Sequence, residues 1–430
     1  MLESETQQKI LDAVDAAFDR QLEFTAALVA LPSLRGEERA AQDLMYDAME
    51  ERGLAMDRWT LDAGELSTHP GFGPVTVSYE QADTVVGTYE PAEPGGRSLI
   101  LNGHVDVVPT GPLENWSRSP WDPAVADGWM YGRGAGDMKA GHAAALFAFD
   151  AVRSAGFDPA GRIHFQSVVE EESTGNGSLS ALMRGYTADA VLIPEPEENM
   201  LVRANVGVIW FTVRVAGQPA HPREMTTGFN AIDAAYAVIA ELRELEARWN
   251  AERGEHEYFS NLDHPINFNV GGISGGDWPS SVPAWCELQM RVSIYPGQGV
   301  DEAWAEVEKA LHSAAQRPEL AGTVPVARRT GFNSEGYVLE PGSDAESVLA
   351  GAHQQAFGSE LDTFTTPGYL DARVFSMYAG IPSLVYGPRS ENIHGFDERV
   401  HLESVRRVTK TMALFVAEWC GIVPTDTSSR

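Results

Sequence analysis

The stretch Arg162–Gly177, RIHFQSVVEEESTGNG, is the part of the sequence that most clearly indicates a fold and a site. Its apolar run Ile163–Val169 predicts a buried strand, which ends in three consecutive carboxylates, Glu170, Glu171 and Glu172. Adjacent carboxylates repel one another, so cations, water or bound protons must offset their charge. Ligands of open α/β sheets bind at the carboxyl ends of strands. The stretch therefore indicates either a metal or proton-transfer site or a solvated acidic loop.

The composition favours a protein of several domains without nucleic-acid or membrane partners. A chain of 430 residues is long enough for two or three domains. Its net charge of -31, from 62 acidic and 31 basic residues, would repel nucleic acid and anionic membranes. The two cysteines, Cys286 and Cys420, cannot form a disulfide framework. Because no apolar run could span a bilayer and the polar N-terminus lacks a signal-peptide pattern, we expect a cytoplasmic protein.

Hydrophobic periodicity predicts an α/β domain that a second domain interrupts. Strands and helices alternate at first, and Val75–Tyr79 and Asp83–Tyr89 are among the expected strands. From Val206 the order becomes β-α-β-β-α-β, which is that of a ferredoxin-like α+β domain. The alternation resumes after GFNSEG (331–336). We therefore assign 1–208 and 333–430 to one catalytic domain and 209–332 to an inserted domain.

Two histidines and three carboxylates stand just past the ends of predicted strands or in turns. Singly, such a histidine is more often a core or surface residue, and an aspartate before a helix is more often a cap. Together they suffice for two metal ions if one carboxylate bridges, and imidazole with carboxylate suits Zn²⁺, and also Co²⁺ or Mn²⁺. Asp106 shares a strand face with His104 and can orient the imidazole ring of His104. The five residues are His104, Asp137, Glu172, Glu195 and His394.

Five sequence blocks resemble, in order, the signature blocks of the M20 metallopeptidase family. They are GHVDVVP (103–109), GRGAGDMKAG (132–141), EEE-x-x-G (170–175), PEP (194–196) and HGFDE (394–398). VAGQPAHP and GFNAI in the inserted domain match as well. That family includes acetylornithine deacetylase, succinyl-diaminopimelate desuccinylase, aminoacylase and glutamate carboxypeptidase. The resemblance implies a zinc-peptidase-like α/β catalytic domain with a mixed sheet, interrupted by a ferredoxin-like dimerisation, or lid, domain.

The resemblance also implies how two metal ions would be held. It makes Asp137 the bridging ligand of both ions. His104 and Glu195 would complete one metal site, and Glu172 and His394 would complete the other.

The resemblance assigns further roles around these ligands. Glu171 would be the general base, with Glu170 the less favoured alternative, and Asp106 would orient His104. Glu170 stands where the family often has Asp, and it would lie behind the ligands instead of binding metal. His221 of the inserted domain would reach into the site of a neighbouring subunit and stabilise the oxyanion. That role implies a homodimer built through the inserted domain.

The substrate-binding positions depart from the family pattern. Relatives that act on α-amino acid derivatives commonly hold the substrate carboxylate with an Asn and an Arg, but Ser280 and Ser293 stand at those positions here. Arg291 lies two residues earlier, about 7 Å along the strand. Since bidentate pairing is geometrically strict, either Arg291 acts from a shifted position, or the substrate lacks an α-carboxylate there, or the alignment is off. Asn230 and Arg373 are further candidate substrate contacts.

These features favour a dimeric two-metal amidohydrolase that removes a small acyl group from a small-molecule amine, as acetylornithine deacetylase does. Trp116, Trp121 and Trp278 could line an aromatic pocket. With the missing Asn/Arg pair, they make an N-formyl or N-acyl heteroaromatic substrate, or the C–N bond of an aryl amine, the alternative. A metallo-dipeptidase or carboxypeptidase is the third reading. A non-catalytic binding protein is disfavoured, because the base and all five ligand positions are present.

Overall fold

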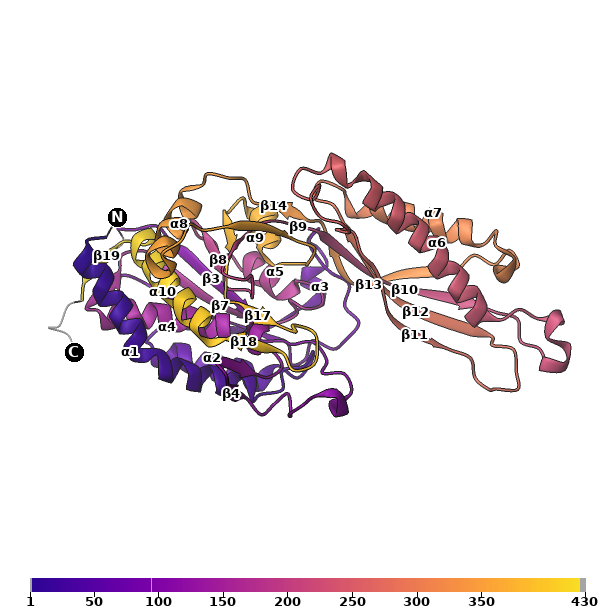
Figure 1. Ribbon diagram of the computed structural model, residues 1–430, viewed down its shortest axis with the longest axis horizontal. Coiled ribbons are helices and arrows are strands. Elements are labelled where there is room, and N and C mark those ends of the chain that lie inside the picture. The colour runs from indigo at the N-terminus through magenta and orange to yellow at the C-terminus, as the bar shows by residue number, and fades with distance from the viewer. Residues whose placement is uncertain (1, 94, 426–430) are drawn as a thin grey trace.

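The computed structural model describes residues 2–93 and 95–425 and has two parts, which lie side by side (Figure 1). The larger part contains both ends of the described chain and is built on a six-stranded sheet in the order β1-β2-β7-β3-β8-β16. β1, β2 and β7 pair antiparallel, whereas β7, β3, β8 and β16 pair parallel. This mixed sheet confirms the predicted fold class. The strands are β1 (Ala55–Thr60), β2 (Asp83–Tyr89), β3 (Leu99–His104), β7 (Ile163–Val168), β8 (Val191–Ile193) and β16 (Ser383–Val385).

The central strands are apolar because both faces of the sheet are covered. Every residue of β3, β7 and β8 is buried. α4 packs on β3 and β7 and is covered in turn by α1 and α10, whereas α2 and α5 pack on β2 and β7. No helix of residues 2–93 and 95–425 is long and apolar enough to cross a membrane. The helices of this part are α1 (Ser4–Val29), α2 (Arg39–Glu51), α3 (Ala63–Leu66), α4 (Ala140–Ser154), α5 (Asn176–Met183), α8 (Asp344–Phe357), α9 (Ala372–Ala379) and α10 (Leu402–Trp419).

The smaller part has a four-stranded antiparallel sheet in the order β11-β12-β10-β13, with α6 and α7 packed together beside it (Figure 1). Its chain order β-α-β-β-α-β is the predicted ferredoxin-like one. Its hydrophobic core is separate from that of the larger part. The boundaries at 209 and 332 stay our proposed division. The elements are β10 (Gly207–Ala216), α6 (Ala231–Ala251), β11 (Phe268–Gly275), β12 (Trp285–Ile294), α7 (Val300–Ala314) and β13 (Val326–Ser334).

Short strands complete the larger part and form the sheets β14-β9-β15, β17-β18-β5-β4 and β19-β6. The second of these sheets flanks the loop that carries His394. The strands are β4 (Ala124–Ala126), β5 (Trp129–Tyr131), β6 (Phe157–Pro159), β9 (Leu201–Asn205), β14 (Tyr337–Val338), β15 (Thr363–Thr366), β17 (Ser390–Glu391), β18 (Arg399–His401) and β19 (Ile422–Pro424).

The prediction of a strand at Val75–Tyr79 was wrong, and the true edge strand β1 was not predicted. Val75–Tyr79 is irregular, and the Tyr79 hydroxyl donates to the Glu170 carboxylate at 2.6 Å instead of joining a sheet edge. β1, AMDRWT, is half-exposed along most of its length, so its residues do not alternate clearly between apolar and polar.

Gly141 allows α4 to approach β8 closely. A Cβ at this position would lie 1.8 Å from the carbonyl oxygen of Pro194. Because Gly141 follows Asp137 by four residues and Pro194 precedes Glu195 directly, this approach brings the two carboxylates to the same end of the sheet.

We expect Gly141→Ala to lower the free energy of unfolding by about 1–3 kcal/mol, because the added methyl group overlaps backbone atoms. The matched control is Gly351→Ala in α8, where nothing lies within 4 Å of an added Cβ. The control should be neutral or stabilising by up to about 1 kcal/mol. Urea unfolding of both variants measures this, and a Gly141→Ala variant as stable as the control would contradict the close packing of α4 on β8.

Candidate metal centre

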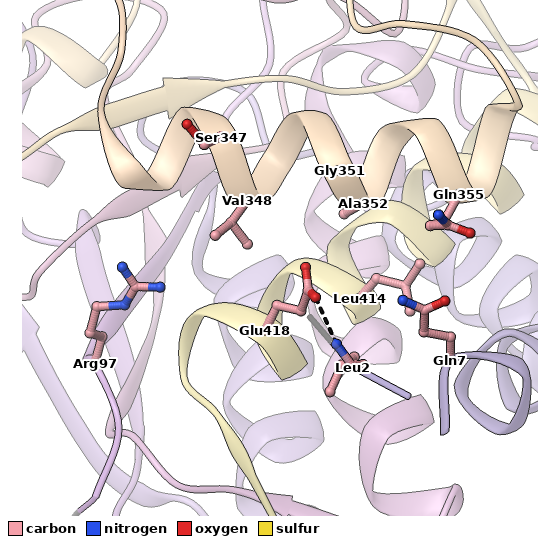
Figure 2. Close-up of a pocket in the computed structure, with 10 residues that line it drawn as sticks. All are labelled: Leu2, Gln7, Arg97, Ser347, Val348, Gly351, Ala352, Gln355, Leu414 and Glu418. Carbon is pink, nitrogen blue, oxygen red and sulfur yellow. Dashed lines mark hydrogen bonds between the residues drawn. The ribbon is translucent and has the colours of Figure 1, made fainter. Parts of the chain in front are cut away.

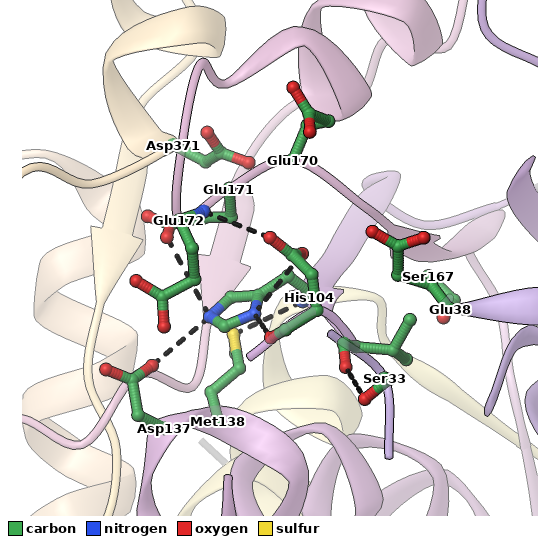
Figure 3. Close-up of polar contacts among 12 residues, drawn as sticks. Ser33, Glu38, His104, Asp137, Met138, Ser167, Glu170, Glu171, Glu172 and Asp371 are labelled. Atoms are coloured by element: carbon green, nitrogen blue, oxygen red, sulfur yellow. Dashed lines mark hydrogen bonds and ion pairs between the residues drawn. The ribbon is translucent and has the colours of Figure 1, made fainter. Parts of the chain in front are cut away.

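The five residues predicted as metal ligands meet at the carboxyl edge of the central sheet. Figure 3 shows three of them, His104, Asp137 and Glu172. They come together because β7, β3 and β8 are neighbours that run parallel, so their carboxyl ends lie side by side. His104 ends β3, Glu172 follows β7, and Glu195 follows β8. Asp137 lies in the turn before α4, and His394 lies in the loop between β17 and β18. We call these five residues the His–carboxylate cluster.

The cluster consists of two halves that share the Asp137 carboxylate. Asp137 Oδ1 lies 3.2 Å from His104 Nε2, and Oδ2 lies 3.4 Å from His394 Nε2. Glu195 Oε1 is 3.6 Å from His104 Nε2 on the first side. Glu172 Oε2 is 3.1 Å from His394 Nε2 on the second. One carboxylate thus faces two imidazoles, each of which has a further carboxylate of its own.

The donor set and its spacing fit two divalent cations. Two donor atoms on one tetrahedral zinc ion lie about 3.3 Å apart, because each bond is about 2.0–2.1 Å long. The imidazole–carboxylate distances in both halves are of that size. Glu195 Oε1 is also buried without a hydrogen-bond donor among the described residues. A cation between the donors of each half would meet this unpaired charge. Two overlapping groups have a spacing that could hold a metal ion, His104 with Asp137 and Glu172, and His104 with Glu171 and Glu195. The assignment of the five ligands to two ions stays a prediction.

The pKa shifts show how strongly the carboxylates attract positive charge. The Glu172 carboxylate, with Asp137, raises the pKa of His394 to about 11. Burial alone would lower the pKa of His104, but Glu195 and Asp137 outweigh it and hold that pKa well above its usual value. Burial raises the pKa of Glu195 to about 7. The two imidazoles therefore stay protonated over a wide pH range unless metal cations replace those protons.

Glu171, the predicted base, lies directly beside the cluster, and its spacing from His104 and Glu195 would also allow it to hold a metal ion. Its Oε2 is 3.9 Å from His104 Nε2, and the residue is 7% exposed. Burial, with the nearby carboxylates of Glu195 and Asp371, raises the pKa of Glu171 well above its ordinary value. A raised pKa makes this carboxylate a stronger proton acceptor, which is what a general base requires.

Asp106 contacts His104 differently from the predicted way. The ring Nδ1 of His104 lies 2.8 Å from the main-chain oxygen of Asp106, whereas the carboxylate Oδ1 is 3.6 Å away. The main-chain carbonyl therefore sets the ring orientation. The carboxylate instead accepts a hydrogen bond from the Glu172 main-chain N–H, at 3.1 Å to Oδ2. Asp106 thus joins the two halves of the cluster.

Sequence reasoning missed the support of Asp137. The buried Glu398 carboxylate accepts hydrogen bonds from the main-chain N–H groups of Gly134, Gly136 and Asp137, at 3.0, 3.0 and 3.1 Å, and pairs with Arg133. Glu398 thereby fixes the turn that presents Asp137. The only sequence signals were the last residue of HGFDE and the Arg of GRGAGD.

The predicted residues of the smaller part lie away from the cluster. His221 is exposed, and its Nδ1 accepts a hydrogen bond from the Arg223 main-chain N–H at 3.0 Å. No hydrogen bond or ion pair joins it to the cluster within residues 2–93 and 95–425. Asn230 caps α6, because its side chain accepts from Ile232 N at 2.8 Å. A cavity of about 560 Å³ lies between Asn230 and Trp278, which is 66% exposed.

The guanidinium groups of both predicted arginines already donate hydrogen bonds within the chain. Arg291 donates to Ser293 Oγ at 2.9 Å and to the Pro367 carbonyl at 3.2 Å. Arg373 is fully buried, and its guanidinium group donates to the hydroxyls of Tyr369 and Tyr378, both at 3.2 Å. Arg373 therefore stiffens the region beside the cluster in this structure, and its contact with substrate stays a prediction.

An aromatic cluster of Trp210, Phe332 and Tyr369 connects the smaller part to the turn that carries Glu171. The ring centroids of Trp210 and Phe332 lie 5.1 Å apart, and those of Phe332 and Tyr369 lie 4.2 Å apart. A Cβ on Gly175, in the same turn as Glu171, would lie 2.0 Å from the Tyr369 hydroxyl. Apolar rings therefore lie next to the predicted base. The sequence did not single out these three rings.

The tryptophans predicted to line a pocket do not gather around the cluster. Trp116 is 8% exposed and packs edge-on against Phe396, two residues beyond His394 in sequence, with 6.2 Å between ring centroids. Trp121 is half-buried. Trp116 thus supports the loop that carries His394.

A further cavity, of about 320 Å³, lies between α8, α10 and the start of α1 (Figure 2). Arg97, which precedes β3, is one of its lining residues. His104 stands at the other end of the same strand, so this cavity and the cluster lie at opposite edges of the sheet.

The chain is similar to known hydrolases of amide bonds over nearly its whole length. It is 28% identical to an N-formyl-4-amino-5-aminomethyl-2-methylpyrimidine deformylase from Halalkalibacterium halodurans, covering 96% of this chain and 98% of that protein. It is 26% identical to a succinyl-diaminopimelate desuccinylase from Delftia acidovorans, covering 90% of this chain and 95% of the relative. Its fold matches that of the dipeptidase Dug1p from Saccharomyces cerevisiae, with a TM-score of 0.81, 14% identity and coverage of 97% and 99%.

One protein family matches most of the chain. Peptidase family M20/M25/M40 matches residues 100–418, which include the whole His–carboxylate cluster and the inserted ferredoxin-like part. The two relatives compared by sequence are named as a deformylase and a desuccinylase. The chain belongs to peptidase family M20/M25/M40 and is a metal-dependent hydrolase of amide bonds.

Proposed function

We propose that the protein removes a formyl group, or another small acyl group, from an aminomethyl heteroaromatic amine that has no α-carboxylate. The observation that carries this proposal is the engagement of Arg291 by Ser293 and Pro367, together with a serine at position 280. A substrate carboxylate would have to compete with these two contacts for the Arg291 guanidinium group, and burying an unpaired carboxylate is costly. The deformylase relative is named for a substrate of the proposed class.

The aromatic cluster supports the same substrate class. Tyr369 lies against the turn of Glu171, and both Tyr369 and Trp210 are partly exposed. Aromatic rings attract a flat heteroaromatic ring by offset or edge-to-face packing. A ring bound there would hold its aminomethyl nitrogen close to Glu171. The acetylornithine-deacetylase-like activity stays a prediction and is the alternative. A dipeptidase activity is disfavoured by the same Arg291 contacts.

The chain's own residues account for the hydrolysis as follows. His104, Glu195, Glu172 and His394 would hold two divalent cations, most simply Zn²⁺, on either side of Asp137. When bound, these cations supply the Lewis acidity that amide hydrolysis needs at neutral pH. Glu171 takes the proton of the attacking water and gives it to the leaving amine. His221 of a second subunit donates to the oxygen that becomes negatively charged. The homodimer and a cytoplasmic location are parts of this proposal.

A panel of N-formyl, N-acetyl and N-succinyl amines tests the substrate class. Each acyl group should be presented on an aminomethylpyrimidine and on an α-amino acid such as ornithine. We expect kcat/KM for the N-formyl pyrimidine to exceed that for every α-amino acid derivative by at least about 100-fold, because only the latter buries a carboxylate. Faster turnover of N-acetylornithine than of the formyl pyrimidine would favour the alternative.

Removal of bound metal tests whether turnover depends on the proposed metal centre. Dialysis against a chelator should abolish turnover, and Zn²⁺, Co²⁺ or Mn²⁺ should restore it.

Glu171→Gln should still bind two equivalents of zinc while kcat falls by about 10²–10⁴-fold, because the variant cannot accept a proton. Unchanged kcat in Glu171→Gln would assign the base elsewhere. Asp15→Asn, at an exposed ion pair with Lys410, serves as the matched control that should not change kcat.

Mixed dimers test the role of His221. Glu171→Gln and His221→Ala should each be nearly inactive alone. After unfolding and refolding together, about half of the dimers carry one of each chain, and one of their two sites has both residues intact. Turnover should therefore return to about a quarter of the wild-type value. No recovery in a confirmed dimer would show that His221 acts within its own chain or not at all.

A further inference from the structure

Glu170 holds the turn that presents both the predicted base and one predicted metal ligand. Its φ angle of 67° is unusual for a residue with a side chain. Such a conformation costs free energy and persists only where the surroundings hold it. Figure 3 shows Glu170 pointing away from His104, so its carboxylate does not belong to the cluster.

Three side chains hold the Glu170 carboxylate. Arg35 pairs with both of its oxygens, with Nη2 at 2.7 Å from Oε2 and Nε on Oε1. The Tyr79 hydroxyl donates to Oε2 at 2.6 Å, and Thr174 Oγ1 donates to it at 2.9 Å. Glu170 is 1% exposed, so these donors stand in for the water that it has lost. The planar guanidinium fork fixes the direction of the carboxylate as well as its position.

Hydrogen bonds of the main chain fix the turn before, between and after Glu171 and Glu172. The carbonyl oxygen of Glu170 accepts from the N–H groups of Thr174 and Gly175, at 3.0 and 2.8 Å. Between them, the N–H of Glu172 donates to Asp106 at 3.1 Å. These hydrogen bonds thus hold the main chain on both sides of Glu171 and Glu172 and at Glu172 itself. Glu171 and Glu172 therefore leave the turn in set directions, one toward His104 and one toward His394.

We propose that Arg35, Glu170 and Tyr79 form a positioning clamp that sets the directions of Glu171 and Glu172. The clamp touches neither substrate nor metal ion and acts only through the turn. Arg35 is contributed by the segment before α2, so this segment becomes part of the catalytic apparatus. The inference rests on the proposed function, because Glu171 is the base and Glu172 a ligand only under that proposal.

The test compares Arg35→Ala, Glu170→Gln and Tyr79→Phe with Arg39→Ala as the matched control. Arg39 is a nearby arginine that pairs with Asp83 at 3.5 Å and is 46% exposed in its side chain. Two readouts are needed, namely steady-state kinetics at saturating zinc and calorimetric titration of the chelated protein with Zn²⁺. A misplaced base lowers kcat, whereas a misplaced ligand weakens metal binding.

We expect kcat of Arg35→Ala and Glu170→Gln to fall about 10- to 100-fold, with KM nearly unchanged, because the reacting groups are displaced by a fraction of an ångström. The affinity for one of two zinc equivalents should fall about 10- to 100-fold. Added guanidinium ion should restore part of the kcat of Arg35→Ala, whereas Arg35→Lys, which keeps the charge and loses the fork, should stay impaired. Arg39→Ala should match the wild type.

Retention of both kcat and zinc affinity at the control level in Arg35→Ala and Glu170→Gln would overturn the clamp. Should these two variants fail to fold, Tyr79→Phe decides, because it removes one hydroxyl and keeps the ring. Unchanged zinc affinity and kcat in Tyr79→Phe would then overturn the proposal. The wild-type enzyme could instead fail to hydrolyse any amine of the N-acyl panel, while the clamp variants still bind zinc more weakly. That result would support the clamp and overturn the proposed substrate.

Discussion

The Asp137 carboxylate between the imidazoles of His104 and His394 is the interaction on which the structure of the site depends. One oxygen faces each ring, at 3.2 and 3.4 Å. Burying a carboxylate is costly unless cations or donors surround it. Here the charge of Asp137 and its neighbours is so concentrated that the pKa of His394 rises to about 11. Two divalent cations would meet the same charge, and this is why a donor set of this kind selects metal ions.

The rest of the catalytic domain serves to bring these charges together. Parallel pairing of β7, β3 and β8 places three strand ends at one edge. Gly141 lets α4 approach β8, and Glu398 fixes the turn of Asp137. The inserted domain contributes Trp210 and Phe332, which pack toward Tyr369 beside the base. The predicted metal ligands thus lie in the larger part of the structure, whereas the proposed substrate side would draw on both parts.

The sequence predicted the features that depend on local pattern. Apolar runs followed by acidic residues or histidine located the strand ends, and topology then brought His104 and Glu195 together. Features that depend on distant partners were not predicted. Arg35 and Glu170 are 135 residues apart, and nothing in LPSLRGEE distinguishes that arginine from a surface residue. Tyr79 was placed in a strand because its neighbours alternate, although its hydroxyl is drawn to Glu170. Arg373 was a candidate contact, yet two tyrosines enclose it.

Crystals of the zinc-loaded protein, measured at the zinc absorption edge, test the central claim most directly. The account predicts two anomalous peaks about 3.5–4 Å apart, one on each side of the Asp137 carboxylate. The first should lie next to His104 and Glu195, and the second next to His394 and Glu172. Peaks elsewhere, or a single peak that leaves Asp137 without a metal contact, would contradict it.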